Sequence, residues 1–244
     1  MTASITPSRQ HPVIAIDGPA GAGKSTLAAH LARRFGFLNL ETGAMYRALA
    51  LKAINNDLGF DEESALVDLA SNTTITLQPQ REGNRVLLDG VDVSRRIREA
   101  DVTAGASQVS VHPRLRTWMV DQQRHLGAAG GVVMEGRDIG TVVFPDAEVK
   151  IFLDAAPEVR GNRRYRQVMP QDAALERPAQ SDAAEQALIR ELKERDARDR
   201  NRAESPLRPA EDAVILDSTT MTLDQVLEAA ENIVREHVTD AQMH

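Results

Sequence analysis

The chain has 244 residues, a formal net charge of −7 at pH 7 and no cysteine. This length suits one large α/β domain with a smaller insertion, and two unrelated full domains are not expected. The lack of cysteine excludes disulfides, thiol catalysis and thiolate metal sites, and the negative charge argues against binding of a nucleic-acid polymer. Because the six histidines show no paired metal-ligand spacing, any metal ion is expected to arrive with a bound nucleotide.

The N-terminal segment, residues 1–11, is polar and has no apolar core of signal-peptide length. No other segment approaches the length of an apolar membrane span. We therefore expect a cytoplasmic monomer with no membrane partner, and flexible tails at residues 1–11 and 239–244.

The sequence GPAGAGKS at residues 18–25 follows a short apolar strand at residues 13–16. A glycine-rich loop of this pattern, placed between a strand and a helix, converges backbone N–H groups on the phosphates of a nucleoside triphosphate. Lys24 is then an exposed loop lysine that reaches the β and γ phosphates, and Ser25 is placed to ligate Mg²⁺. Leu27, Leu31 and Phe35 share one face of the following helix, which is expected to stop at Gly36. The predicted ATP-binding residues are Gly18, Pro19, Ala20, Gly21, Ala22, Gly23, Lys24, Ser25 and Thr26.

Further apolar strands are predicted at residues 132–134, 149–153 and 213–216, separated by helical segments. This order is typical of a parallel sheet covered by helices on both faces, so the fold class is α/β. Between them, residues 74–78 and 85–89 predict a small hairpin, with residues 90–93 following it. We expect this region to form a peripheral α+β lobe over residues 71–111.

Two motifs near the predicted phosphate loop each allow a second interpretation. The sequence ETGAMYR at residues 41–47 opens a helix with free N–H groups and an arginine one turn on, which predicts an anion site; the alternative is an ordinary helix cap. The sequence EGRDIG at residues 135–140 follows a strand, so Arg137 and Asp138 are expected in the ligand crevice; the alternative is a salt bridge in a turn.

The segment at residues 169–182 is rich in Pro, Gln, Asp and Ala, which predicts a mobile loop ahead of a charged helix at residues 183–202. Pairs four residues apart, such as Glu191 and Arg195 or Asp196 and Arg200, are also typical of a solvated helix with ion pairs along it. Beside a phosphate loop, an arginine-rich segment favours a lid that closes over transferring phosphates. The chain ends in a helix opened by a capping box at residues 222–225.

Taken together, these motifs resemble those of the bacterial cytidylate kinases, a family of nucleoside monophosphate kinases, over nearly all of residues 12–238. The resemblance implies transfer of the ATP γ-phosphoryl group to CMP or dCMP, with Mg²⁺ bound to ATP. The segments that carry it are residues 16–26, 42–47, 136–147, 194–202 and 216–220.

The resemblance also implies roles for single residues. Ser107, Arg116 and Asp138 would face the cytosine, and Asp199 would contact the ribose. Lys24 and Arg195 would act on the donor phosphates and the transition state. The acceptor phosphate would be held by Arg47, Arg137 and Arg202, and the CMP site as a whole would comprise Thr42, Tyr46, Arg47, Ser107, Arg116, Arg137, Asp138, Asp199 and Arg202. The catalytic residues would be Lys24, Arg137, Arg195 and Arg202.

The implied organisation is a kinase core at residues 12–70 and 112–238, a CMP-binding insertion at residues 71–111 and a lid at residues 157–205. Two features depart from the family pattern. The segment at residues 169–182 is longer than in short members, so Arg163, Arg164 and Arg166 are not assigned lid roles. Glu135 stands where an aspartate is familiar, and we interpret this change as neutral.

Some alternatives stay open at this stage. Asp154, at the end of a predicted strand, resembles a Walker B aspartate that could organise Mg²⁺ through water, and Asp17 is a similar candidate. A P-loop kinase of another monophosphate or of a small hydroxylated metabolite would share the core and the lid. It would leave the GRD and RDRNR motifs unexplained. A GTP-dependent switch would need an Asn-Lys-x-Asp run, which the sequence lacks.

Overall fold

The computed structural model describes residue 9 and residues 11–80, 83–168 and 179–238. Its main sheet has five parallel strands in the order β2-β6-β1-β7-β8. Continuous apolar runs form the central strands because both faces of a parallel sheet are buried. The four strands predicted from the sequence are confirmed, and the short edge strand β2 is an addition. The strands are β1 (Val13–Asp17), β2 (Leu38–Glu41), β6 (Val132–Gly136), β7 (Val149–Asp154) and β8 (Val214–Asp217).

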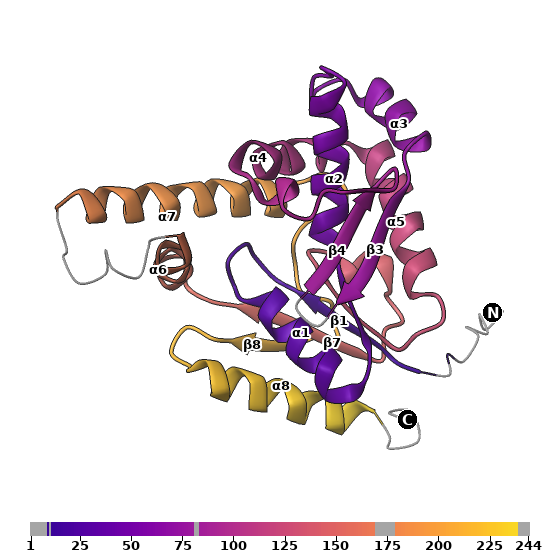
Figure 1. Cartoon of the computed structure of the whole chain (residues 1–244). Coiled ribbons are helices and arrows are strands. Elements are labelled where there is room, and N and C mark those ends of the chain that lie inside the picture. Colours follow the sequence, from indigo (N-terminus) through magenta and orange to yellow (C-terminus); the bar gives the residue numbers. More distant parts are fainter. Residues whose placement is uncertain (1–8, 10, 81–82, 169–178, 239–244) are drawn as a thin grey trace.

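Alternate residues of β1 belong to two separate hydrophobic clusters, one on each face of the sheet. Val13 and Ala15 join the cluster that includes α2 (Thr42–Asn55) and α5 (Pro113–Gly127). Ile14 and Ile16 join the cluster on the other face, with α1 (Lys24–Phe35) and α8 (Leu223–His237). Figure 1 shows α1 and α8 together on one side of the sheet. The predicted layout of helices on both faces of a parallel sheet is therefore confirmed.

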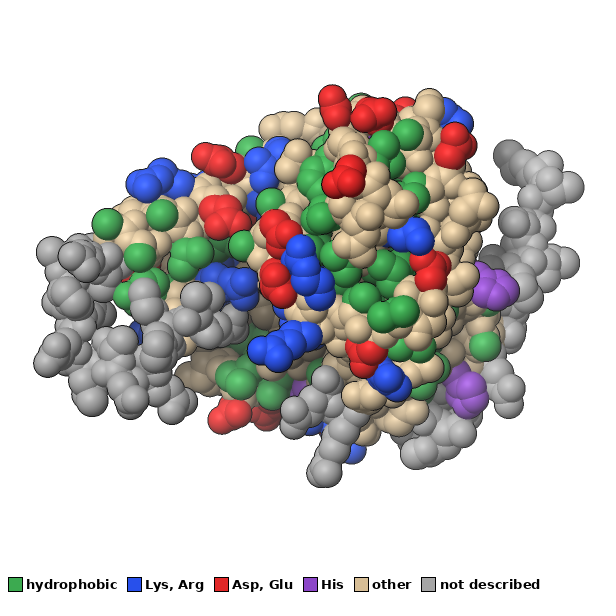
Figure 2. All heavy atoms as spheres, turned by 45° about the horizontal axis from the view of Figure 1, so that its top comes forward, with side chains coloured by type: hydrophobic (Ala, Val, Ile, Leu, Met, Phe, Trp, Pro, Cys, Tyr) green, Lys and Arg blue, Asp and Glu red, His purple; other side chains and the backbone are tan. Residues whose placement is uncertain are grey.

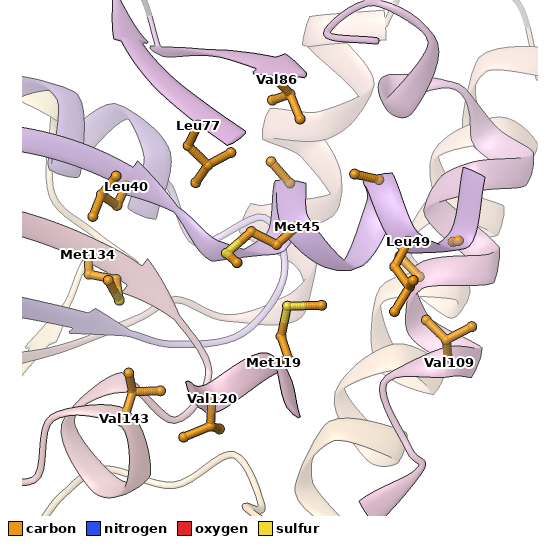
Figure 3. Close-up of a cluster of buried hydrophobic side chains, with 14 of the residues drawn as sticks. Leu40, Met45, Leu49, Leu77, Val86, Val109, Met119, Val120, Met134 and Val143 are labelled. Atoms are coloured by element: carbon orange, nitrogen blue, oxygen red, sulfur yellow. The ribbon is translucent and has the colours of Figure 1, made fainter. Parts of the chain in front are cut away.

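A second, antiparallel sheet consists of β3 (Ile75–Gln80), β4 (Gly83–Leu88) and β5 (Val91–Asp92). This confirms the predicted hairpin. Its inward side chains Leu77 and Val86 belong to the same cluster as Leu40 and Met45 of the main domain, as Figure 3 shows. The hairpin thus packs on the core through a shared apolar cluster. Around it lie α3 (Glu63–Ser71), the 3₁₀ turn η1 (Arg96–Arg98) and α4 (Ala100–Val109).

The helices α6 (Pro157–Val168) and α7 (Ala179–Arg200) pack closely on each other, and in Figure 1 α7 extends away from the main sheet. A Cβ atom on Gly161 would lie 2.3 Å from Cγ1 of Ile189, so only glycine permits this contact. The predicted charged helix is confirmed, although it begins at residue 179 and ends at residue 200. Most of the predicted loop at residues 169–182 lies outside the described residues.

Helix ends follow the predicted signals. Gly36 ends α1 in the left-handed conformation at φ +74°, and the side chains of Thr222 and Gln225 form the capping box of α8. The single-turn π-helix η2 (Ile139–Val143) after β6 was not predicted. Among the helices of the described ranges, none combines the length and apolar content needed to cross a bilayer.

Candidate active site at the carboxyl ends of the strands

The phosphate loop lies at the carboxyl end of β1, between the ends of β6 and β7, which pair with β1 on either side. A Cβ atom on Gly18 would lie 2.0 Å from the carbonyl oxygen of Leu153, so this close approach of loop and strand requires glycine. Gly23 precedes α1 at φ +101°, and the free N–H groups of the helix N-terminus follow it. This geometry is that of an anion site on a helix N-terminus.

Lys24 is buried, with 5% of its surface exposed, which corrects the expectation of an exposed loop lysine. Its Nζ donates a hydrogen bond of 2.8 Å to the carbonyl oxygen of Pro19, so the side chain folds back under its own loop. Burial lowers the pKa of Lys24 to about 7, and the positive charge of Arg137 acts in the same direction. An anion bound in the loop would raise the pKa of Lys24 again, because a nearby negative charge favours the ammonium form.

Ser25 and Glu135 join the phosphate loop to the end of β6. The Ser25 hydroxyl donates to Oε1 of Glu135 at 2.7 Å, and the Thr42 hydroxyl donates to the Glu135 carbonyl oxygen at 2.7 Å. The Glu135 side chain is therefore part of the site, although the sequence indicated only a neutral replacement. Hydroxyl and carboxylate oxygens are the ligands that Mg²⁺ prefers. No cluster of three or more His, Cys, Asp or Glu side chains that could hold a metal ion occurs within the described ranges.

Asp17 is buried and holds the loop that follows β6. Its two carboxylate oxygens accept hydrogen bonds from the backbone N–H groups of Ile139 and Gly140, at 2.8 and 2.7 Å. Burial raises the pKa of Asp17 to about 7, even though these hydrogen bonds favour the charged form. Asp154, the other candidate for Mg²⁺, accepts at Oδ1 from the N–H of Ala155 at 2.8 Å. Both carboxylates thus have structural hydrogen bonds.

The arginines predicted to bind the acceptor phosphate come from separate segments, and each lies near a carboxylate. Arg47 pairs with Glu41 at the start of α2. Arg137 donates from Nε to Oδ2 of Asp199 at 2.9 Å, and Nη1 of Arg202 lies 3.9 Å from Oδ1 of the same aspartate. Figure 2 shows basic and acidic side chains next to each other near the middle of the face it displays. The charges of Arg137 and Arg202 lower the pKa of Asp199, although its burial acts most strongly in the opposite direction.

The residues predicted to face a base meet near Tyr46. Arg116 of α5 forms a buried ion pair with Asp138, and its guanidinium lies 5.8 Å from the centre of the Tyr46 ring. Burial raises the pKa of Tyr46 to about 12, so its hydroxyl stays protonated. Ser107 of α4 accepts a hydrogen bond of 3.4 Å from Nε of Arg198, a contact that the sequence did not predict. The sequence left open a salt bridge within the turn that contains Asp138. Asp138 instead pairs with Arg116, which lies 22 residues away in the sequence.

Arg195 differs from the other arginines of the site. Within the described ranges its guanidinium forms no ion pair, whereas the other arginines of the site each pair with a carboxylate. Its Nε atom is buried without a hydrogen-bond partner, a feature that it shares with Arg47, Arg116 and Arg202. Burial lowers the pKa of Arg195 to about 10, and the nearby charge of Arg137 adds to this effect. The ion pairs expected along a solvated helix do not form among the described residues, since Asp196 turns inward to Arg160 and Arg200 lies 3.9 Å from Asp154.

One contact between α6 and the end of β8, and a pocket beside it, were not predicted from the sequence. Arg163 donates to the hydroxyl and the carbonyl oxygen of Ser218 at 3.1 and 2.8 Å, whereas Arg164 and Arg166 are exposed. A cavity of about 530 Å³ lies beside this contact, between α6, α7 and the start of α8. Its lining includes polar groups suited to a ligand: Glu158, Asn162, Arg163, Arg166, Glu185, Thr219, Thr220 and Thr222.

The chain matches the model of the cytidylate kinase family over residues 14–236. The cytidylate kinase of Aeromonas hydrophila is 49% identical over 216 residues, covering 88% of this chain and 90% of the relative. That of Vibrio parahaemolyticus is 48% identical over 223 residues, covering 91% and 95%. That of Geobacter sp. strain M21 is 45% identical over 227 residues, covering 93% and 94%.

Among solved structures, a shikimate kinase from Acinetobacter baumannii is 16% identical, covers 94% of this chain and 96% of its own, and has a TM-score of 0.40. That likeness is too weak to bear on function. The family match and the three relatives instead span most of the chain, including every motif that the structure gathers at the strand ends. The resemblance seen in the sequence is thereby confirmed, and the chain belongs to the cytidylate kinase family.

Proposed function

We infer that this protein transfers the γ-phosphoryl group of ATP to CMP, giving CDP and ADP. The observation that carries this inference most directly is Arg195, a half-buried guanidinium near Lys24 of the phosphate loop that forms no ion pair within the described ranges. A buried charge without a partner is costly, and a phosphoryl group in transfer supplies the missing anion. Family membership favours this activity over a P-loop kinase of a small metabolite.

For the donor, we propose that the backbone of residues 18–26 binds the ATP phosphates and that Lys24 moves from the Pro19 carbonyl to the β and γ phosphates. Kinases of this family use ATP with Mg²⁺, and the oxygen donors of Ser25 and Glu135, 2.7 Å apart, fit that ion. Bound there, Mg²⁺ would neutralise phosphate charge. The cavity next to Arg163 and Ser218 is our candidate for the base of the donor.

For the acceptor, we propose that the phosphate of CMP is held by Arg47, Arg137 and Arg202, with Thr42 and Tyr46 completing its site. This proposal is supported by the three arginines, which come from separate segments of the chain and each lie next to a carboxylate, a group whose oxygens resemble those of a phosphate. These carboxylates neutralise the arginines before substrate arrives, and a phosphate would take their place. Planar guanidinium groups suit this exchange, since they bind carboxylate and phosphate oxygens alike in a bidentate manner.

For the base and sugar, we propose that Asp138 accepts from the exocyclic amine of cytosine, while Arg116 donates to the ring and Ser107 adjusts to both. Asp199 would contact the ribose. The proposed contacts to the base and to the phosphate do not involve the 2′-hydroxyl, so we expect dCMP to be a second acceptor. The burial of Arg116 and Asp138, at 3% and 6% exposed, supports a recognition role, because buried polar groups discriminate strongly when a ligand fails to pair with them.

Phosphoryl transfer needs little covalent chemistry from the protein. In a loose, in-line transition state the charge spreads over the equatorial oxygens, so positioning and neutralisation supply most of the catalysis. We propose that Lys24, Arg137, Arg195 and Arg202 provide this neutralisation, and that residues 157–205 act as a lid that excludes water. The CMP-binding role of residues 71–111, the monomeric state and the cytoplasmic location stay predictions.

A single assay tests the proposed function. ADP formation from Mg-ATP is followed with CMP, dCMP, UMP, AMP and GMP, and with hydroxylated metabolites such as shikimate. We expect turnover to be fastest with CMP, with dCMP close behind. Faster turnover with a hydroxylated metabolite or a purine monophosphate would contradict the proposal, and GTP hydrolysis without an acceptor would indicate a different class of protein.

A further inference from the structure

Arg160 is a buried arginine of α6 that belongs to none of the predicted substrate contacts. Only 2% of its surface is exposed. Its Nε donates to the carbonyl oxygen of Ala155 at 2.8 Å, and its Nη1 donates to the carbonyl oxygen of Ala20 at 2.8 Å. Its Nη2 donates to Oδ2 of Asp196 at 2.6 Å. One side chain thus joins the end of β7, the phosphate loop and α7.

The partner Asp196 lies on α7 between residues that we propose to be functional. Arg195 precedes it, and Asp199, one turn further along, pairs with Arg137. Asp196 is buried, and its Oδ1 atom has no hydrogen-bond partner. The ion pair with Arg160 therefore supplies most of the compensation for a buried carboxylate. It also determines where this turn of α7 lies relative to the phosphate loop.

Packing supports the same link. A Cβ atom on Gly21 of the phosphate loop would lie 3.4 Å from Cβ of Arg160 and 3.7 Å from Cδ2 of Leu192 on α7. The tip of the loop is thus in near contact with both helices. A second ion pair joins the same two helices, Lys193 with Glu158 at 2.8 Å, but its side chains are 52% and 63% exposed and it does not touch the loop.

We propose that Arg160 and Asp196 are positioning residues for phosphoryl transfer: the pair holds Arg195 in register with the phosphate loop. This proposal rests on the proposed function. The Arg160 guanidinium bonds a loop carbonyl with one nitrogen and the α7 carboxylate with another, so a shift of the loop moves the helix turn that carries Arg195. An error of about 1 Å in such positioning can cost on the order of a hundredfold in rate.

The test compares three variants with the wild type, assayed with Mg-ATP and CMP well below their melting temperatures. Asp196→Asn keeps the size of the side chain and removes its charge. Arg160→Lys keeps the charge, but its single nitrogen cannot reproduce the three separate bonds of the guanidinium. Lys193→Met is the matched control, because it breaks the exposed ion pair between the same helices. The readouts are kcat, the KM for each substrate and the dissociation constant of CMP alone.

We expect kcat to fall by roughly tenfold to a hundredfold in Asp196→Asn and Arg160→Lys. The dissociation constant of CMP should stay within about threefold of the wild-type value in both variants. Lys193→Met should keep the wild-type kcat and CMP affinity. If Asp196→Asn does not fold, Arg160→Lys decides the question. A folded variant with a lower melting temperature but normal kcat would show a structural role only and would overturn the proposal. Equal losses of kcat and CMP affinity would overturn it as well. Failure of the wild type to phosphorylate CMP would refute the proposed function instead.

Discussion

Replacement of Asp138 by asparagine should weaken the preference for CMP over UMP while leaving a folded enzyme. Cytosine offers an amine donor and a ring-nitrogen acceptor, whereas uracil offers a carbonyl and an N–H at the same positions. A carboxylate at residue 138 therefore suits cytosine alone. Asparagine is isosteric, and its amide can present an N–H to the uracil carbonyl or an oxygen to the cytosine amine.

The magnitude follows from burial. Arg116 and Asp138 are nearly inaccessible to water, so UMP would leave both charged groups facing the wrong partner. Each unsatisfied buried group costs about 1–3 kcal/mol, and about 1.4 kcal/mol corresponds to a tenfold change. Wild-type kcat/KM should thus favour CMP over UMP by at least about tenfold. In Asp138→Asn this ratio should shrink by about tenfold, mainly through a loss of CMP turnover.

The assay measures kcat/KM for both monophosphates at saturating Mg-ATP. Asp138→Asn is preferable to Asp138→Ala, because alanine would leave the buried Arg116 with the Ser110 carbonyl oxygen but no carboxylate to neutralise its charge, which could unfold the site. The control is Asp212→Asn, which alters an ion pair with Lys150 outside the predicted CMP-binding residues and should keep the wild-type ratio. Equal use of CMP and UMP by the wild type, or an unchanged ratio in Asp138→Asn, would refute the base assignment.

Three further predictions follow from the same geometry. Lys24→Ala should fold but lose at least about a hundredfold in kcat, because the ammonium neutralises charge in the transition state; normal turnover by a folded variant would rule out this role. Limited proteolysis within residues 160–205 should slow when CMP and a non-hydrolysable ATP analogue are both bound, and equal rates with and without ligands would contradict a lid. The pKa of Asp17 is raised from 3.8 to about 7 by burial, so between these pH values the folded state holds a proton that the unfolded state has released. The stability that this proton contributes is therefore lost as the pH rises from 3.8 to about 7. Between pH 5 and pH 7, the free energy of unfolding measured with urea should fall by about 2 kcal/mol more in the wild type than in Asp17→Asn. An equal fall in both proteins would show that Asp17 does not titrate in this range.

The sequence predicted the central sheet well because buried parallel strands are continuous apolar runs. It did not predict β2, whose four residues LNLE include an exposed Leu38 and end at the charged Glu41. Such a short edge strand has no periodicity that separates it from a loop. The phosphate loop and the capping box were predictable for the opposite reason, since each depends on local backbone geometry that a few neighbouring residues determine.

The arginine-rich segment shows where local reasoning fails. Spacing of four residues predicts ion pairs along α7, yet Asp196 pairs with Arg160, which lies 36 residues away in the sequence. A pair along α7 and the pair with Arg160 would each neutralise the charge of Asp196. Which of them forms depends on which face of the helix is buried, and the spacing of charges does not reveal that face. Arg160 itself had no signal, because one arginine in a helix that also contains Arg163, Arg164 and Arg166 looks like part of a solvated surface.

The carboxylates beside the predicted phosphate-binding arginines bear on how the site gains selectivity. Glu41, Asp138 and Asp199 each neutralise an arginine that is buried or half-buried and would otherwise be costly to fold. Under the proposed function, binding of a phosphate by Arg47 or Arg137 would exchange one oxyanion for another, so much of the electrostatic gain would be offset by the carboxylate contact that is lost. We expect this exchange to reduce the affinity for a phosphate alone. A base that offers both a donor to Asp138 and an acceptor to Arg116 would compensate for the loosening of their ion pair, whereas a base of the opposite polarity would not. We therefore expect discrimination among monophosphates to depend on the proposed base contacts, which makes the Asp138→Asn comparison the most sensitive test of the site.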